Sequence, residues 1–498
     1  MKIEFRTISF NRLLEWLVLL VPGMMFLSPD IETNPYIDKT TAWIVLCMSI
    51  VIIVAIRFNQ RLRIPMLNIF ILNYVGFWHV RYLTLLIYPE HQIVLKRTVI
   101  IGTEKFNEYS LLVLLSLTAA FVGIFLAHGL YGNFDRKGVT GKDKINGVQV
   151  SQFVENQLRL ASGYCITALC FLLFVMQYCA TVEIPWWLGY LSYLFNMQFI
   201  IFLCLYVLLA DNVAKKIKYL FGCYLALYVI LTVLAGSRSM LLHSMIYLFS
   251  MLFLYKKDVR FKPRHLLLGL ILILAMGISF IFATAQRAFR EEVGFRISAD
   301  LLLFNLGRSM DFFSSDSSET IQNTIGMATA RAGYLDFGAE MYANDIYANV
   351  INIANIAKST IDQLIPGAIF EDSQGLSQRI RNIYDLSGST AYQADAINAV
   401  GENYILFGYG CPVVIAFVAF VFTSCYLLIG NTVFGIWLKF VLLCNFMFWW
   451  NSFGYDWLLL DIARQSVFGS LLLVMLSCKK KVRLFGRERA RQSSGVRP

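Results

Sequence analysis

The sequence predicts an all-α, polytopic integral membrane protein. Of its 498 residues, 58% are hydrophobic and only 15% are charged, whereas a soluble protein carries roughly 25% charged residues. The apolar residues gather in blocks of about 18 to 25 residues, the length that a helix needs to cross a hydrocarbon core of roughly 30 Å. Because open sheets and loops cannot cross lipid, we expect these blocks to be transmembrane helices.

The apolar blocks predict about twelve transmembrane helices, nine before a long polar segment and three after it. They lie near residues 10–28, 41–56, 64–88, 109–131, 160–180, 186–209, 219–235, 239–255, 266–285, 402–429, 433–453 and 456–477. The chain therefore divides into a membrane domain (1–285), a large polar segment (286–400), the last three helices (401–478) and a basic tail (479–498).

The loops between these blocks alternate in charge. Lys and Arg are concentrated in RFNQRLR (57–63), DRKGVTGKDK (135–144), DNVAKKIK (211–218), KKDVRFKPR (256–264) and the tail, and they are sparse in the other loops. Basic loops remain in the cytoplasm, so both termini are predicted to be cytoplasmic. The net charge of +11 is thus explained by membrane orientation and by attraction to membrane lipids, and a nucleic-acid partner is not expected.

The same orientation places the segment 286–400 on the extracytoplasmic face. It contains fourteen Asp or Glu residues against eight Lys or Arg, and it is rich in Phe and Tyr. Structureless loops of this length are uncommon in ordered proteins, and the apolar content argues against disorder. We expect a large, mostly helical external loop that serves as a functional cap.

Neither the cysteines nor the histidines form a recognisable site. The ten cysteines lie in or at the ends of apolar blocks, so no disulfide framework is indicated. The five histidines show no metal-ligand spacing. The sequence therefore predicts no metal and no other cofactor.

Arginine in apolar surroundings is the strongest functional signal. Arg238 interrupts the run LTVLAGSRSMLLHSM (231–245), which divides into two helices joined by a turn at Gly236. Arg238 would then lie at the outer tip of a hairpin, on the same side as Arg287 and Arg290, with Arg81 in the outer part of the third span. Guanidinium groups bind phosphates through paired hydrogen bonds, so these four residues are candidate ligands of a lipid-linked diphosphate. The alternatives are an arginine that snorkels to the interface, an arginine that bridges spans, and binding of an anionic phospholipid.

Two carboxylates precede the tenth predicted span, in AYQADAINAVGENYILFGYGCP (391–412). Asp395 and Glu402 would lie at the outer membrane face, within reach of the arginines. Either one is a candidate general base for a sugar hydroxyl. The alternative for Glu402 is that it caps a helix start or pairs with an arginine.

The segments AGSRSMLL (235–242) and GENYILFGYG (401–410), together with one large external loop late in the chain, resemble the Wzy-type O-antigen polymerases. That family stands within a wider group that includes the O-antigen ligases. The resemblance implies a GT-C-like glycosyltransferase of the bacterial inner membrane that uses undecaprenyl-diphosphate-linked oligosaccharides and needs no nucleotide sugar. It also implies a chain-length regulator as a possible partner protein.

Three alternatives remain beside the polymerase. An O-antigen ligase is expected to carry a histidine in its large external loop, and residues 286–400 contain none. A flippase or transporter of lipid-linked oligosaccharides would favour two similar halves, which the sequence lacks. A membrane acyltransferase would need a histidine within the membrane, for which His79 and His243 are available, although packing is the more ordinary role for both.

Overall fold

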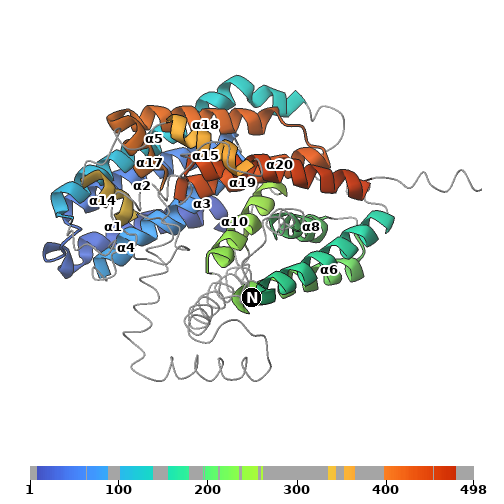
Figure 1. Cartoon of the computed structure of the whole chain (residues 1–498). Coiled ribbons are helices and arrows are strands. Elements are labelled where there is room, and N and C mark those ends of the chain that lie inside the picture. The colour runs from blue at the N-terminus through green and yellow to red at the C-terminus, as the bar shows by residue number, and fades with distance from the viewer. Residues whose placement is uncertain are drawn as a thin grey trace, which may run out of the picture.

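The computed structural model describes a helical bundle (Figure 1). The described residues are 8–62, 64–87, 101–137, 155–178, 195, 197–210, 213–234, 238–255, 260–261, 335–343, 353–364, 398–451 and 454–477. Among them, the sole strand pairing joins β1 (Ile8–Ser9) to β2 (Arg260–Phe261) in antiparallel register. The remaining elements are helices.

The helices follow the predicted apolar blocks closely. In the first part of the chain they are α1 (Phe10–Leu27), the 3-10 helix η1 (Pro29–Glu32), α2 (Lys39–Leu62), α3 (Pro65–Tyr74), the π-helix η2 (Val75–His79), α4 (Val80–Ile87), α5 (Thr103–Lys137) and α6 (Glu155–Tyr178). In the second part they are α8 (Met197–Leu209), α9 (Lys215–Leu234), α10 (Arg238–Tyr255), α14 (Leu335–Ala343), α15 (Ile353–Leu364), α17 (Ala399–Phe407), the 3-10 helix η6 (Gly408–Gly410), α18 (Cys411–Leu428), α19 (Val433–Asn451) and α20 (Tyr455–Ser477). The predicted ninth span, 266–285, lies outside the described residues.

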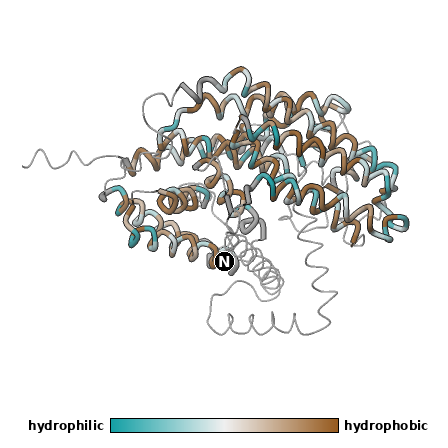
Figure 2. Tube along the Cα trace, turned by 180° about the vertical axis from the view of Figure 1, so that it is seen from behind, coloured by the Kyte–Doolittle hydropathy of each residue, from teal (hydrophilic) through white to brown (hydrophobic). Residues whose placement is uncertain are grey.

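Seven segments of the described chain are long and apolar enough to cross a membrane. They are Lys39–Gln60, Pro65–Ile87, Thr103–Gly132, Gln157–Phe174, Ala399–Leu428, Val433–Asn451 and Trp457–Leu476. Large apolar side chains on these segments are exposed, such as Leu126 (57%), Phe417 (65%) and Met475 (68%). Hydrophobic residues run along much of the length of the helices (Figure 2). The prediction of an α-helical membrane protein is confirmed.

Helices α5 and α18 pack closely against each other and lie side by side (Figure 1). Gly123 permits this approach, because a Cβ at that position would lie 2.1 Å from the carbonyl oxygen of Ala416. Small residues let backbones approach in membranes, where van der Waals packing drives helix association. Ser116 and Cys411 lie 3.5 Å apart at the same interface (Oγ to Sγ).

Polar side chains join helices inside the bundle. The indole of Trp78 donates to Asn451 Oδ1 (3.2 Å), and Asn451 Nδ2 donates to Asn73 Oδ1 (2.8 Å). His79, at the end of η2, lies with Nε2 3.1 Å from Ser49 Oγ, which is a packing role of the kind expected for it. Buried polar groups in lipid need such partners, so these contacts hold α3, η2, α2 and α19 in register.

The tenth predicted span, 402–429, is not one continuous helix. Helix α17 ends at Phe407, Gly408 adopts a positive φ of 57°, and α18 begins at Cys411 with a proline in its first turn. The Val400 carbonyl oxygen lies 3.6 Å from Cys411 Sγ, which shows that the chain turns between these two residues. Glycine after a helix end and proline at a helix start are ordinary boundary signals, and GYGCP contains both.

Segments predicted to share one membrane face contact each other. On the predicted outer face, Asn34 Nδ2 donates to the carbonyl oxygen of Leu85 (3.0 Å), and Tyr109 donates to Asn398 (2.9 Å). On the predicted inner face, Arg57 pairs with Glu15 (2.9 Å). These contacts agree with the predicted alternation of loops.

Candidate functional site

The described residues include part of the predicted site. Arg238 is the first residue of α10, which begins shortly after α9 ends at Leu234, as a hairpin requires; its side chain lies outside the described part. Arg287, Arg290 and Asp395 lie outside the described residues. Glu402 and Arg81 are described with their side chains.

Glu402 lies in the first turn of α17 and is completely buried. Its Oε1 accepts a hydrogen bond from the backbone N–H of Tyr455 (2.8 Å), the first residue of α20. A carboxylate at this position satisfies one of the open N–H groups of a helix start and interacts favourably with the helix dipole. The capping alternative is therefore observed, but at α20 and not at the helix that carries Glu402. The role of Glu402 as a general base stays a prediction.

The first turn of α17 is held by two further contacts. Asn398 is the N-cap, since its Oδ1 accepts from the backbone N–H of Gly401 (2.8 Å), and the same oxygen accepts from the hydroxyl of Tyr109 (2.9 Å). The hydroxyl of Tyr455 donates to Asn403 Oδ1 (2.9 Å). Hydrogen bonds around the first turn of α17 thus join it to α5 and α20, on the predicted outer face.

Arg81 lies on α4 and is completely buried. Its Nη1 donates to Thr84 Oγ1 (3.5 Å), and Thr84 donates back to the carbonyl oxygen of Arg81 (3.0 Å). This burial places the guanidinium among protein side chains and away from the lipid surface. A diphosphate could reach it only if the surrounding helices moved, and its predicted phosphate-binding role remains untested.

Four tyrosines gather where α5, α14 and α17 meet, and we call them the outer tyrosine cluster (Tyr109, Tyr342, Tyr404 and Tyr409). The ring centroids of Tyr342 and Tyr404 lie 4.7 Å apart, and Tyr404 meets Tyr409 edge to face at 5.8 Å. Three members are buried, whereas Tyr409 is 75% exposed. The cluster thus presents the ring of Tyr409 at the surface, packed next to three buried tyrosines.

The hydroxyl of Tyr342 links this cluster to a carboxylate. It donates to Glu108 Oε2 (3.1 Å) and lies 3.3 Å from the hydroxyl of Tyr409, while Lys105 also donates to Glu108 Oε2 (2.9 Å). Burial, followed by the hydrogen bonds with Tyr409 and Glu108, raises the pKa of Tyr342. The phenol therefore stays protonated and keeps its ability to donate.

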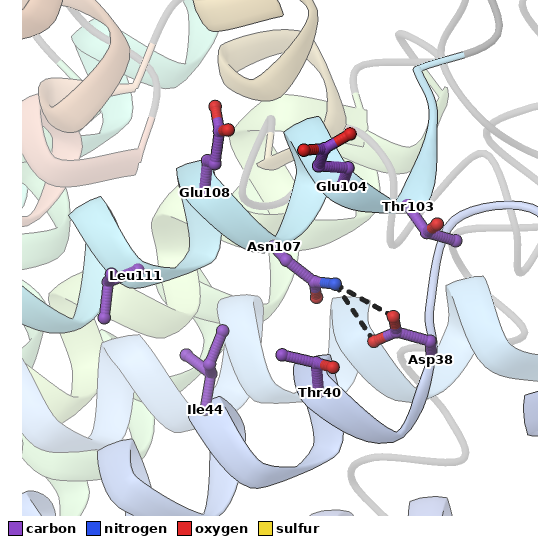
Figure 3. Close-up of a pocket in the computed structure, with 8 residues that line it drawn as sticks. All are labelled: Asp38, Thr40, Ile44, Thr103, Glu104, Asn107, Glu108 and Leu111. Carbon is purple, nitrogen blue, oxygen red and sulfur yellow. Dashed lines mark hydrogen bonds between the residues drawn. The ribbon is translucent and has the colours of Figure 1, made fainter.

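Glu108 also lines a recess of about 500 Å³ between the starts of α2 and α5, which we call the outer recess (Figure 3). Its lining residues are Asp38, Thr40, Ile44, Thr103, Glu104, Asn107, Glu108 and Leu111. Asn107 Nδ2 donates to both carboxylate oxygens of Asp38 (3.1 and 3.0 Å). Figure 3 shows Glu104 and Glu108 on the same side of α5, away from Asp38.

The outer recess offers hydroxyls, an amide and carboxylates beside the apolar side chains of Ile44 and Leu111. Within the described residues, no group of three or more His, Cys, Asp and Glu side chains is arranged to hold a metal ion. Carboxylates and amides that accept hydrogen bonds are suited to a ligand rich in hydroxyl groups. Sequence reasoning missed this recess because its two walls come from segments far apart in the chain.

The chain matches no protein-family model, no curated protein and no solved structure. The fold and the site define a helical membrane protein with a polar, partly aromatic surface at one end of the bundle.

Proposed function

We propose that this protein polymerises lipid-linked oligosaccharide repeat units at the outer face of a bacterial inner membrane. It would be a GT-C-like glycosyltransferase with twelve transmembrane helices, both termini in the cytoplasm and the segment 286–400 outside. The donor is the growing glycan on undecaprenyl diphosphate, and the acceptor is the non-reducing end of an incoming lipid-linked repeat. A chain-length regulator is the proposed partner.

The observation that carries this proposal is the position of the GENYILFGYG segment (401–410). Its first residues are buried and joined to α5 and α20 through Asn398 and Tyr455, and its turn presents Tyr409 beside the outer recess through Tyr342. A surface with an exposed aromatic ring and several carboxylates is suited to a glycan. The loop charges predict that this surface lies on the extracytoplasmic face, where the proposed donor and acceptor would meet.

The proposed reaction transfers a glycosyl group without any external energy source. A hydroxyl of the acceptor attacks the anomeric carbon of the growing chain, and the bond from that carbon to the diphosphate oxygen breaks. The proton of the hydroxyl passes to a carboxylate, for which Glu402 and Asp395 are the candidates. Undecaprenyl diphosphate leaves with the bonding electron pair, and Arg238, Arg287, Arg290 and Arg81 are the proposed cations for its developing charge.

Reconstitution tests the proposal directly. Purified protein in lipid nanodiscs is incubated with lipid-linked repeat units alone, and the products are separated by gel electrophoresis. We expect a ladder of glycans that differ by one repeat unit, with release of the lipid diphosphate. A ladder that requires nucleotide sugar, or no product beyond single repeats, would reject this function.

A further inference from the structure

We propose that the outer recess, extended by Tyr409, is the subsite that binds the terminal sugar of the acceptor. Glu108 accepts hydrogen bonds from its hydroxyl groups, and the ring of Tyr409 stacks on the sugar. The inference rests on the proposed function, and it assigns substrate contact to Glu108 and Tyr409, which are not among the proposed catalytic or diphosphate-binding residues.

Glu108 lines the outer recess and contacts the outer tyrosine cluster through Tyr342. Both of its described hydrogen bonds, from Lys105 and Tyr342, end on Oε2. Its side chain is 40% exposed, and within the described part of the chain Oε1 takes no hydrogen bond. A carboxylate that is fixed through one oxygen and open at the other is well prepared to accept a ligand hydroxyl.

Tyr409 differs from a tyrosine that only anchors a helix at the membrane interface. Such a residue directs its hydroxyl toward water and headgroups, but the hydroxyl of Tyr409 lies 3.3 Å from that of Tyr342. The residue is 75% exposed, and its ring meets the ring of Tyr404 edge to face. The polar atom is therefore held by the protein while the flat apolar surface remains open, which suits stacking against a sugar ring.

The charge of the recess restricts which sugar fits. Glu104 and Glu108 stand four positions apart on α5, where like charges destabilise a helix, and Asp38 lines the same recess. A sugar that carries its own carboxylate would be repelled by these groups. The subsite is therefore suited to a neutral sugar or to one that carries an amino group.

Glu402 and Glu108 differ in accessibility, and this difference supports Glu108 as the carboxylate that binds the acceptor sugar. Glu402 is completely buried and engaged in capping α20, whereas Glu108 is open to the recess. The acceptor sugar can therefore reach Glu108 without any movement of the helices.

The test uses the full-length protein in nanodiscs with a lipid-free acceptor. The oligosaccharide repeat is released from the lipid-linked fraction of the source organism and labelled with a fluorophore at its reducing end. Its elongation by lipid-linked donor gives kcat and KM for the acceptor. Glu108→Gln and Tyr409→Ala are compared with two control variants. Glu32→Gln alters another glutamate that is paired with a lysine, although its side chain is more exposed (69% against 40%), and Tyr219→Ala alters a tyrosine of nearly equal exposure (73% against 75%).

We expect Glu108→Gln and Tyr409→Ala each to raise the KM for the labelled acceptor by about tenfold, as for loss of one strong ligand contact. The kcat should change less than threefold, and both controls should match the wild type. An unchanged KM in both recess variants would overturn the subsite while leaving the polymerase intact. If the wild type elongates nothing, the proposed function fails. Fluorescence anisotropy then measures binding of the labelled acceptor to the wild type and to Glu108→Gln. Weaker binding by Glu108→Gln supports the subsite, and equal binding by the two proteins overturns it.

Discussion

The carboxylate of Glu402 caps α20 by accepting a hydrogen bond from the backbone N–H of Tyr455, 2.8 Å away and 53 positions later in the chain. The hydroxyl of Tyr455 in turn donates to Asn403, the neighbour of Glu402. Tyr455 thus donates both hydrogen bonds, and these fix α17 to the start of α20. Any chemical role of Glu402 has to be separated from this structural one.

Glu402→Gln makes that separation, because the amide oxygen can still accept from Tyr455 while the side chain can no longer take up a proton. If Glu402 is the general base, kcat for elongation falls by about 10² to 10⁴-fold and the melting temperature stays within a few degrees. Glu402→Ala serves as the comparison and is expected to lower the melting temperature as well. Elongation by Glu402→Gln at more than half the wild-type rate would assign the carboxylate to capping alone.

Arg238→Ala is expected to abolish long polysaccharide in cells while single lipid-linked repeats accumulate on the outer leaflet. The reason is loss of the cation proposed to stabilise the leaving diphosphate. Arg238→Lys keeps the charge but loses the paired hydrogen bonds, so it should retain only partial activity. Gel analysis of the glycans and labelling of surface-exposed repeats measure both outcomes. Normal chain lengths in Arg238→Ala would contradict the assignment, and repeats confined to the cytoplasmic leaflet would indicate a flippase.

Gly123→Ala is expected to destabilise the protein, because its Cβ would lie 2.1 Å from the Ala416 carbonyl oxygen and would separate α5 from α18. Overpacking of this kind costs about 1–3 kcal/mol. Gly129→Ala on the same helix is the matched control, since a Cβ there meets nothing within 4 Å. Thermal unfolding in detergent should rank Gly129→Ala at or above the wild type and Gly123→Ala below it, and equal melting temperatures for the two variants would refute the close approach.

Asn451→Leu removes the partners of both Trp78 and Asn73 within the bundle. A buried donor without an acceptor costs about 1–3 kcal/mol, so the melting temperature should fall. The second substitution Trp78→Phe deletes the orphaned indole N–H, and the double variant should therefore lose less stability than the two single variants added together. Strict additivity of the two losses would show that the pair is not coupled.

The sequence correctly predicted an α-helical membrane protein, because apolar length determines which segments can cross lipid. Twelve spans were predicted, and within the described residues seven segments are long and apolar enough to cross. Helix α9 ends at Leu234 and α10 begins at Arg238, on either side of the predicted turn at Gly236. Helix α18 ends at Leu428 and α19 begins at Val433, as the predicted spans 402–429 and 433–453 require. The division of the tenth predicted span was not predicted from the sequence, although GYGCP contains the glycine and the proline found at this helix boundary. The π-helix Val75–His79 has no comparable signal in the sequence.

The site was harder to predict than the fold. Glu402 was identified as a residue of interest, but its partner Tyr455 is chosen by the packing of three helices. The outer recess was missed entirely, since Asp38 and Asn107 are 69 positions apart and neither lies in a recognisable motif. Pairings between distant segments depend on how helices pack, and a pattern of single residues does not contain that information.

The turn at Gly408 also shortens the continuous helix that this apolar segment forms. The apolar segment Ala399–Leu428 contains 30 residues, and as one helix it would be about 45 Å long, far beyond a hydrocarbon core of roughly 30 Å. With the turn, the 18 residues of α18 form a helix of their own, about 27 Å long. A crossing by α18 alone would avoid hydrophobic mismatch without tilting the helix or deforming the lipid.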